Sequence, residues 1–193
     1  MSRRRPPQYD LPNPAPQPLR VVQKLLNTWD DEHRREFLET TVDLESWLAE
    51  QGLPKTRVRA ADLRRVTEVR EALRSLALVN SGHELDDGAR TALARETKRA
   101  PLAVAFSDGT AELVPASSGI DAALARIFAI VHDAMLDGTW ERLKACKNCH
   151  WSFYDKSKNR SATWCSMELC GNRLKTKRYR SRRRQEPPRG APG

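Results

Sequence analysis

The sequence lacks any long hydrophobic run. Across its 193 residues, no stretch approaches the roughly 18 uninterrupted apolar residues that a membrane-spanning helix needs. The first residues are basic, but neither an apolar core nor a small-residue cleavage site follows them, so we predict no signal peptide. The sequence therefore predicts a cytoplasmic protein without a membrane anchor.

Catalytic motifs are missing as well. Neither a G-x-S-x-G elbow, nor a phosphate-binding P-loop, nor an H-E-x-x-H zinc motif occurs in the chain. The three histidines before the cysteines, His33, His83 and His132, are scattered, and an ordinary surface or core role explains each of them. We therefore predict that the protein is not an enzyme.

Cysteine is scarce and confined to one short segment. The four cysteines have the spacing C-x2-C, fifteen intervening residues, then C-x4-C. Disulfides are rare in a reducing cytosol, so clustered cysteines there indicate a metal site first. Zinc takes four thiolate or imidazole ligands in a tetrahedron, and a closely spaced pair supplies two of them from one turn. We predict one zinc ion, bound by Cys146, Cys149, Cys165 and Cys170.

Other interpretations of these cysteines stay open. They could be unligated or form a redox C-x-x-C pair, and His150 could compete as a ligand. Four thiolates leave no open position for water, which favours a structural ion over a catalytic one. Residues 151–154 and 162–165 suit the two strands of a hairpin, with Trp151, Phe153 and Trp164 as a small core. Cys170 then falls on a helix, as in a treble-clef module.

Positive charge is concentrated at one end of the chain. Residues 140–193 carry 15 Lys and Arg against 4 Asp and Glu, a balance of +11, whereas residues 1–139 have a balance of −2. Residues 173–184 alone carry eight positive charges and no acid. A polyanion relieves this self-repulsion, and each neutralised phosphate releases a counterion. A solvated basic tail without a specific partner is the alternative. The predicted nucleic-acid contacts in this segment are Arg173, Lys175, Lys177, Arg178, Arg180, Arg182, Arg183 and Arg184.

The first two thirds of the chain read as helices around one small β element. Apolar residues recur at three- and four-residue steps in 19–29, 44–48 and 63–76, each typical of an amphipathic helix. Two apolar runs on either side of Asp108-Gly109 predict a β-hairpin. Residues 120–138, apolar nearly all round, predict the central helix. The fold class predicted is α+β, mainly helical, followed by a small treble-clef-like zinc finger.

The composition divides the chain into four segments. Six prolines between Pro6 and Pro18 predict a disordered tail over 1–18. A mostly helical domain is expected at 19–138, the zinc finger with its basic helix at 139–184, and a second disordered tail at 185–193.

Two sets of motifs resemble known families. The string Cys170-Gly171-Asn172-Arg173, after C-x2-C and the Trp-x-Phe-x-Asp segment 151–155, resembles the CGNR zinc finger. The Leu-Leu-Asn-Thr-x-Asp segment 25–30 and the D-L-x-x-W-L segment 43–48 resemble the ABATE domain that usually precedes this finger. The resemblance implies a bacterial, stress-induced transcription regulator whose first domain senses a ligand. It also implies zinc ligation by the four cysteines, with structural or nucleic-acid contacts for Asn172 and Arg173.

These observations favour a DNA-binding transcription regulator. Arg173, held near the metal, is the best candidate for a base contact, and Arg178 to Arg184 suit phosphates. By analogy, the first domain senses a small-molecule effector or forms a homodimer. Two alternatives stay open: an RNA- or ribosome-associated protein that stacks bases on Trp151 and Tyr179, and an adaptor whose zinc-scaffolded basic tail meets an acidic protein.

Overall fold

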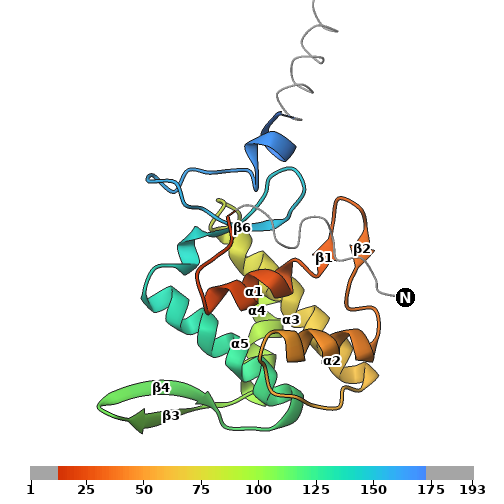
Figure 1. Ribbon diagram of the computed structural model, residues 1–193, viewed down its shortest axis with the longest axis vertical. Coiled ribbons are helices and arrows are strands. Elements are labelled where there is room, and N and C mark those ends of the chain that lie inside the picture. Colours follow the sequence, from red (N-terminus) through yellow and green to blue (C-terminus); the bar gives the residue numbers. More distant parts are fainter. Residues whose placement is uncertain (1–12, 173–193) are drawn as a thin grey trace, which may run out of the picture.

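A computed structural model describes residues 13–172 of the chain, and within them five α-helices surround one core (Figure 1). Three two-stranded antiparallel pairs accompany the helices, which confirms the predicted α+β class. The elements are α1 (Leu19–Leu26), β1 (Trp29–Asp30), β2 (Arg35–Glu36), α2 (Thr41–Glu50), α3 (Ala60–Val79), α4 (Asp87–Arg99), β3 (Leu102–Ser107), β4 (Thr110–Pro115), α5 (Gly119–Leu136), η1 (Trp140–Arg142), β5 (Leu143–Ala145), β6 (Ser152–Tyr154) and η2 (Met167–Gly171).

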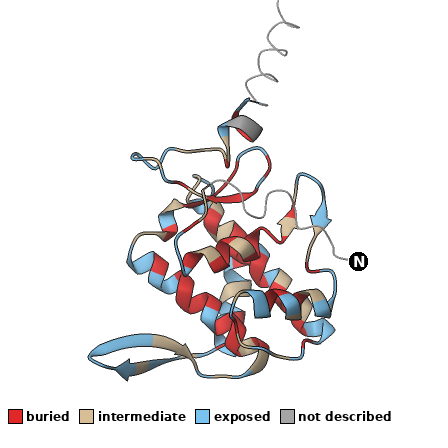
Figure 2. Ribbon diagram, in the orientation of Figure 1, coloured by how far each residue is buried: buried red, intermediate tan, exposed pale blue. Residues whose placement is uncertain are grey.

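The core lies where α1, α3 and α5 meet. Helix α1 packs on both α3 and α5, and α3 runs along α4. Figure 2 shows the buried residues gathered on the inward faces of these helices. Helix α5 is buried along most of its length, as its nearly all-apolar sequence predicts. Within residues 13–172, no helix combines the length and the apolarity needed to cross a bilayer.

Local side-chain bonds determine where two of the helices begin. The hydroxyl of Thr40 accepts a hydrogen bond from the Asp43 amide (3.2 Å), and the Asp43 carboxylate accepts one from the Thr40 amide (2.8 Å). This capping box satisfies amides that have no partner inside the helix. The cap of α2 is therefore Thr40, directly before the first helical residue. Asp86 caps α4 by accepting a 2.8 Å hydrogen bond from the Ala89 amide.

A buried ion network joins three helices. Glu96 of α4 is fully buried, and its carboxylate bonds the guanidinium groups of Arg65 (2.8 Å) and Arg95 (3.0 Å). Arg99 lies one turn away (3.6 Å). Arg65 of α3 also reaches Asp121 of α5 at 2.7 Å. Burial alone would raise the pKa of Glu96, but the hydrogen bonds from Arg65 and Arg95 lower it below its ordinary value of 4.5.

Replacing Glu96 with glutamine should destabilise the helical body by about 3 kcal/mol at neutral pH, because it leaves the buried Arg65 charge poorly compensated. The lowered pKa gives the sign of the pH dependence. The ionised carboxylate contributes its full stability above pH 4.5 and loses it as the pH falls further. Urea unfolding at pH 7 and at lower pH measures the free energy of unfolding of wild type and Glu96→Gln. The difference between the two values should become smaller on acidification. Glu84→Gln, at an exposed position, is the control, and a difference independent of pH would contradict the assignment.

The predicted β-hairpin is present and projects away from the helices (Figure 1). Strands β3 and β4 pair over six residues each, from Leu102 opposite Pro115 to Ser107 opposite Thr110. Asp108 and Gly109 form the turn, both with positive φ, as the Asp-Gly pair predicts. The base of the hairpin packs on α5, while Phe106 near its tip is 82% exposed.

Part of the predicted N-terminal tail is ordered. Residues 13–18 lie against the body: Ala15 is buried, and its amide donates a 2.7 Å hydrogen bond to the side chain of Gln23. The Asn13 carbonyl accepts a bond from the Tyr154 amide. The prolines therefore mark an extended segment with specific partners here, while the remainder of the predicted tail, 1–12, lies outside the described residues.

Candidate metal centre and its junction with the helices

The four cysteines converge on one point. Their sulfur atoms all lie within 4.8 Å of one another, and each of the four residues is buried. The separations Cys149–Cys165, Cys165–Cys170 and Cys149–Cys170 are 3.7, 3.6 and 3.5 Å. A zinc–sulfur bond of about 2.3 Å gives a tetrahedron whose edges are about 3.8 Å. The donor set and its spacing therefore fit one structural zinc ion.

The turn around the first cysteine pair is built from main-chain bonds. The Cys146 amide donates to the Trp151 carbonyl (2.9 Å), and the His150 amide donates to the Cys146 carbonyl (3.0 Å). His150 has a φ of +56°, which closes the turn and brings both sulfurs to the same side. Buried Trp151 and Phe153, with Trp164 against them, form the small predicted core beside the sulfurs.

The thiols interact too strongly to ionise together without a cation. Hydrogen bonds from Cys149 and Cys165 lower the pKa of Cys146. The same contacts raise the pKa of Cys149 and of Cys165, because their protons are held against the Cys146 sulfur. A divalent cation would replace these protons and stabilise all four thiolates, so metal binding must release protons.

The hairpin of the finger differs from the predicted one. Residues 151–154 were expected to pair with 162–165, but β6 pairs instead with β5, from Leu143 opposite Tyr154 to Ala145 opposite Ser152. Strand β5 directly precedes the first cysteine, so the tight C-x2-C turn itself connects the two strands. Leu143 is fully buried in the core formed by the helices, which favours this pairing over one confined to the finger.

A buried ion pair organises the loop between the two cysteine pairs. The Lys144 ammonium bonds the Asp155 carboxylate at 2.8 Å, and both side chains are at least nine-tenths buried. Asp155 also accepts bonds from the amides of Ser157 and Ala162 (both 2.9 Å). Burial would raise the pKa of Asp155, but these bonds lower it to about 2. The Asp of the Trp-x-Phe-x-Asp segment thus folds the loop 155–162 over the hairpin.

His150 is not part of the cysteine cluster. Its Nδ1 atom lies 2.8 Å from a carboxylate oxygen of Asp31, in the loop between β1 and β2, and the cluster that could hold a metal contains the four cysteines alone within residues 13–172. The alternative in which His150 replaces a cysteine as a metal ligand is therefore wrong. His150 instead joins the finger to the helical body.

Side chains of the helical body form hydrogen bonds with the main chain of the finger. The amide group of Asn27 donates to the Ser152 carbonyl (2.9 Å) and accepts from the Ser152 amide (2.8 Å), so it pairs with β6 as another strand would. Gln23 donates to the same carbonyl (3.1 Å). Arg74 of α3 donates to the carbonyls of His150 (3.3 Å) and Leu26. We call Gln23, Asn27 and Arg74 the latch.

Replacing Asn27 with alanine should lower the free energy of unfolding by about 2–3 kcal/mol, because the buried Ser152 amide loses its side-chain partner and the Ser152 carbonyl keeps only Gln23. Chemical denaturation of the zinc-loaded protein measures this. Ser152→Ala is the matched control: its buried hydroxyl has no hydrogen-bond partner among the described residues, so its removal should cost little. Equal destabilisation by the two substitutions would show that Asn27 acts through packing alone.

Of the predicted nucleic-acid contacts, Asn172 alone lies within residues 13–172. Asn172 is exposed directly after η2, which carries Cys170. Residues Arg173 to Arg184 lie outside the described residues. Trp151, proposed from the sequence as an exposed stacking residue, is 4% exposed. Its ring belongs to the core of the finger, which removes this support for RNA binding, and Tyr179 lies beyond the described part.

The latch was not predicted from the sequence. Gln23 and Asn27 read as polar positions on an amphipathic helix, and Arg74 as one of several solvated arginines of α3. Their partners include main-chain groups as many as 129 residues away. A usable signal was the polar pair Asn27-Thr28 directly after the apolar face of α1, where both residues are buried.

Comparisons with known families agree with this architecture. Residues 19–137 match the family model ABATE, described as "Putative stress-induced transcription regulator". Residues 142–183 match the family model described as "CGNR zinc finger". The first match covers more than half of the chain, and the two occur in the order that the motifs predicted. A search of curated proteins found no match.

Proposed function

This chain belongs to the ABATE family and carries a CGNR zinc finger after that domain; we propose that it is a bacterial, cytoplasmic transcription regulator that binds duplex DNA. In this proposal one structural zinc ion positions the basic segment, and the chain catalyses no reaction. The helical body supplies regulation, by sensing a small-molecule effector or by forming a homodimer.

The convergence of the four sulfurs next to the basic segment carries the proposal. Cys170 lies three residues before Arg173, the first of the eight positive charges. A metal centre at this point fixes where the basic segment leaves the folded finger. Oriented cations can then meet a phosphate backbone without first losing the freedom of a long linker.

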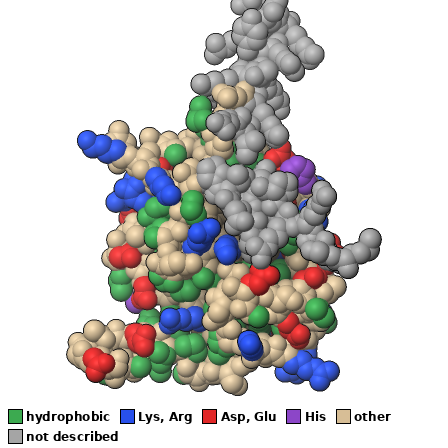
Figure 3. Space-filling view, in the orientation of Figure 1, with side chains coloured by type: hydrophobic (Ala, Val, Ile, Leu, Met, Phe, Trp, Pro, Cys, Tyr) green, Lys and Arg blue, Asp and Glu red, His purple; other side chains and the backbone are tan. Residues whose placement is uncertain are grey.

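The charge distribution of the helical body also supports nucleic-acid binding by the finger and the residues after it. On the face drawn in Figure 3, acidic and basic side chains are interspersed over the helical body. Residues 1–139 have a balance of −2, against +11 for residues 140–193. Attraction of a polyanion should therefore be concentrated on the finger and the residues after it.

Titration of the zinc-loaded protein into labelled duplex DNA and labelled RNA, followed by anisotropy at several salt concentrations, tests the proposal. We expect duplex binding whose affinity falls steeply with salt, because several counterions are released. Preference for single-stranded RNA would assign the protein to the RNA-associated alternative. Failure to bind either polymer at moderate salt would refute the nucleic-acid function and favour an acidic protein partner.

A further inference from the structure

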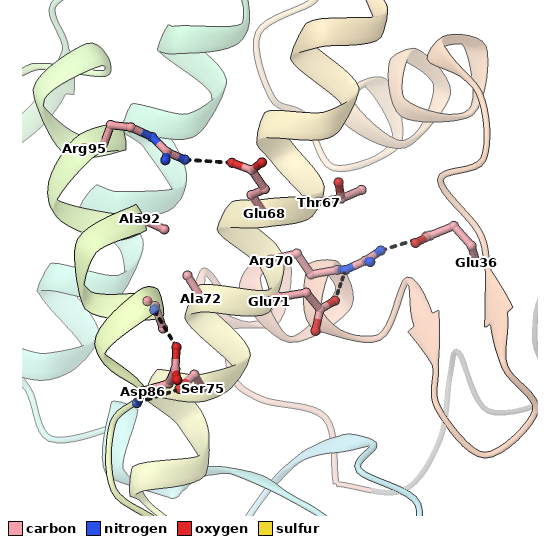
Figure 4. Close-up of a pocket in the computed structure, with 12 residues that line it drawn as sticks. Glu36, Thr67, Glu68, Arg70, Glu71, Ala72, Ser75, Asp86, Ala92 and Arg95 are labelled. Atoms are coloured by element: carbon pink, nitrogen blue, oxygen red, sulfur yellow. Dashed lines mark hydrogen bonds and ion pairs between the residues drawn. The ribbon is translucent and has the colours of Figure 1, made fainter.

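A hollow lies between α3 and α4, with Glu36 of β2 at its border (Figure 4). Its volume is about 630 Å³, within the range of small-molecule sites. The residues that line it include Ala72 of α3 and the small residues Gly88, Ala89 and Ala92 of α4. Because these side chains are short, the two helices leave room between them for a compact apolar group.

The border of the hollow is mainly acidic. Two arginines face an excess of carboxylates, which leaves a formal charge of −2. The charged residues of the lining are Glu36, Glu68, Arg70, Glu71, Asp86 and Arg95.

Both arginines already have partners within the protein. Arg70 is almost fully buried and bonds Glu36 (2.7 Å) and Glu71 (2.7 Å). Arg95 bonds Glu68 across the gap at 2.7 Å (Figure 4). An anionic ligand would have to displace these carboxylates to reach a guanidinium, so the arginines do not make the hollow an anion site.

The carboxylates, in contrast, keep acceptor capacity. Within residues 13–172, the second oxygen of Glu36, of Glu68 and of Asp86 takes no hydrogen bond, since each residue uses only one oxygen for its partners. A carboxylate can accept bonds at both oxygens. Excess negative charge around an apolar floor therefore suits a ligand with a positive head and a short apolar stem.

One of these carboxylates is connected to the zinc finger. Glu71 bonds Arg70 through one oxygen and Arg74 through the other (3.0 Å). Arg74, the member of the latch on α3, donates in turn to the carbonyl of His150, directly after Cys149. Glu71 lies one turn after Glu68 on α3, so a cation bound at Glu68 would also attract the Glu71 carboxylate. It would then compete with Arg74 for this carboxylate and so act on the latch.

We propose that this hollow is an effector site for a small organic cation, an amine or guanidinium on a short apolar stem, and that its occupancy changes the hold of Arg74 on the zinc finger. The proposal deepens the regulatory role proposed above and rests on it for its consequence. Binding of the cation requires no DNA, so the effector site and the DNA-binding function can be refuted separately.

Calorimetric titration of the zinc-loaded full-length protein tests the binding step. The probes are putrescine, spermidine and agmatine, with succinate as the anionic comparison. We expect saturable binding of at least one cation, and none of succinate. Glu68→Gln should weaken that binding about tenfold, because one charge-assisted bond is lost. Glu112→Gln, on the exposed β4 strand, should leave it unchanged.

Three results would overturn the binding step: absence of saturable binding for every cation, equal affinity in Glu68→Gln and wild type, or tighter Glu68-dependent binding of a peptide of residues 173–184 than of any amine. The last result would assign the hollow to the basic segment of the chain itself.

Amide hydrogen exchange over residues 146–152 tests the connection. With saturating cation, exchange there should become faster in wild type, because the cation displaces Arg74 from Glu71 and so disturbs the bond of Arg74 to the His150 carbonyl. In Arg74→Lys the cation should still bind but leave the exchange unchanged, since lysine cannot bridge the same two carbonyls. Glu71→Gln provides a second variant if Arg74→Lys folds poorly, and it should likewise uncouple the finger. Unchanged exchange in the wild type despite saturated binding would refute the connection while leaving the DNA function untouched.

Discussion

The substitution Cys165→Ser should unfold the finger while the helices persist. A module of this size draws much of its folding free energy, roughly 10 kcal/mol or more, from zinc, and three thiolates no longer close the tetrahedron. The helices have a separate core that includes none of the cysteines. Circular dichroism should therefore keep most of its helical signal, with less than one bound zinc per chain. The melting temperature should fall, because Gln23 and Asn27 lose their partner in β6.

The exposed loop substitution Ser161→Ala is the control, and a strong chelator added to wild type should reproduce the effect. A single transition that removes all helical signal at a much lower temperature would contradict this expectation. The segments 19–138 and 139–184 would then be one folding unit. Leu143, which the finger contributes to the core of the helices, is the contact through which such coupling would act.

Truncation after Leu174 should remove most of the affinity for nucleic acid. It deletes seven of the eight positive charges between residues 173 and 184. Each neutralised phosphate contributes about 0.9 to the slope of the logarithm of the binding constant against the logarithm of the salt concentration. Loss of seven charges should therefore make this slope shallower by up to about 6 units. At low salt the affinity should drop on the order of a thousandfold. Anisotropy titrations at four salt concentrations measure both quantities.

The matched control ends at Gln185, which keeps the whole basic segment and deletes only the residues after it. It should bind like the full chain. If truncation after Leu174 leaves the affinity unchanged, the binding surface lies on the body or on the finger itself. The finger loop, with Lys156, Lys158 and Arg160, would then be the next surface to test.

The metal centre was predictable because its determinants are local. Two closely spaced cysteine pairs bring four sulfurs to one point almost regardless of what surrounds them. The nearby aromatic residues were correctly expected to form a small core. The position of α5 and the β3–β4 hairpin followed from equally local patterns, an all-apolar helix and an Asp-Gly turn.

Features that depend on distant partners were not predictable. Residues 162–165 have a strand-like sequence, yet β6 pairs with β5, because Leu143 gains burial in the core of the helices. Glu96 lies in a helix whose sequence reads as solvent-exposed, and only the meeting of α3, α4 and α5 reveals its three-way ion network. Such positions need the tertiary contacts before their chemistry can be recognised.

The latch also bears on how the two parts of such a protein can diverge. Asn27 bonds the amide and the carbonyl of Ser152, groups that nearly every amino acid offers. The finger can therefore accumulate substitutions along β6 and still dock, whereas a change at Asn27 removes two of the hydrogen bonds that attach it. Selection should accordingly act unequally on the two sides of this junction. A body with an intact asparagine could accept fingers of varied sequence without rebuilding its own surface.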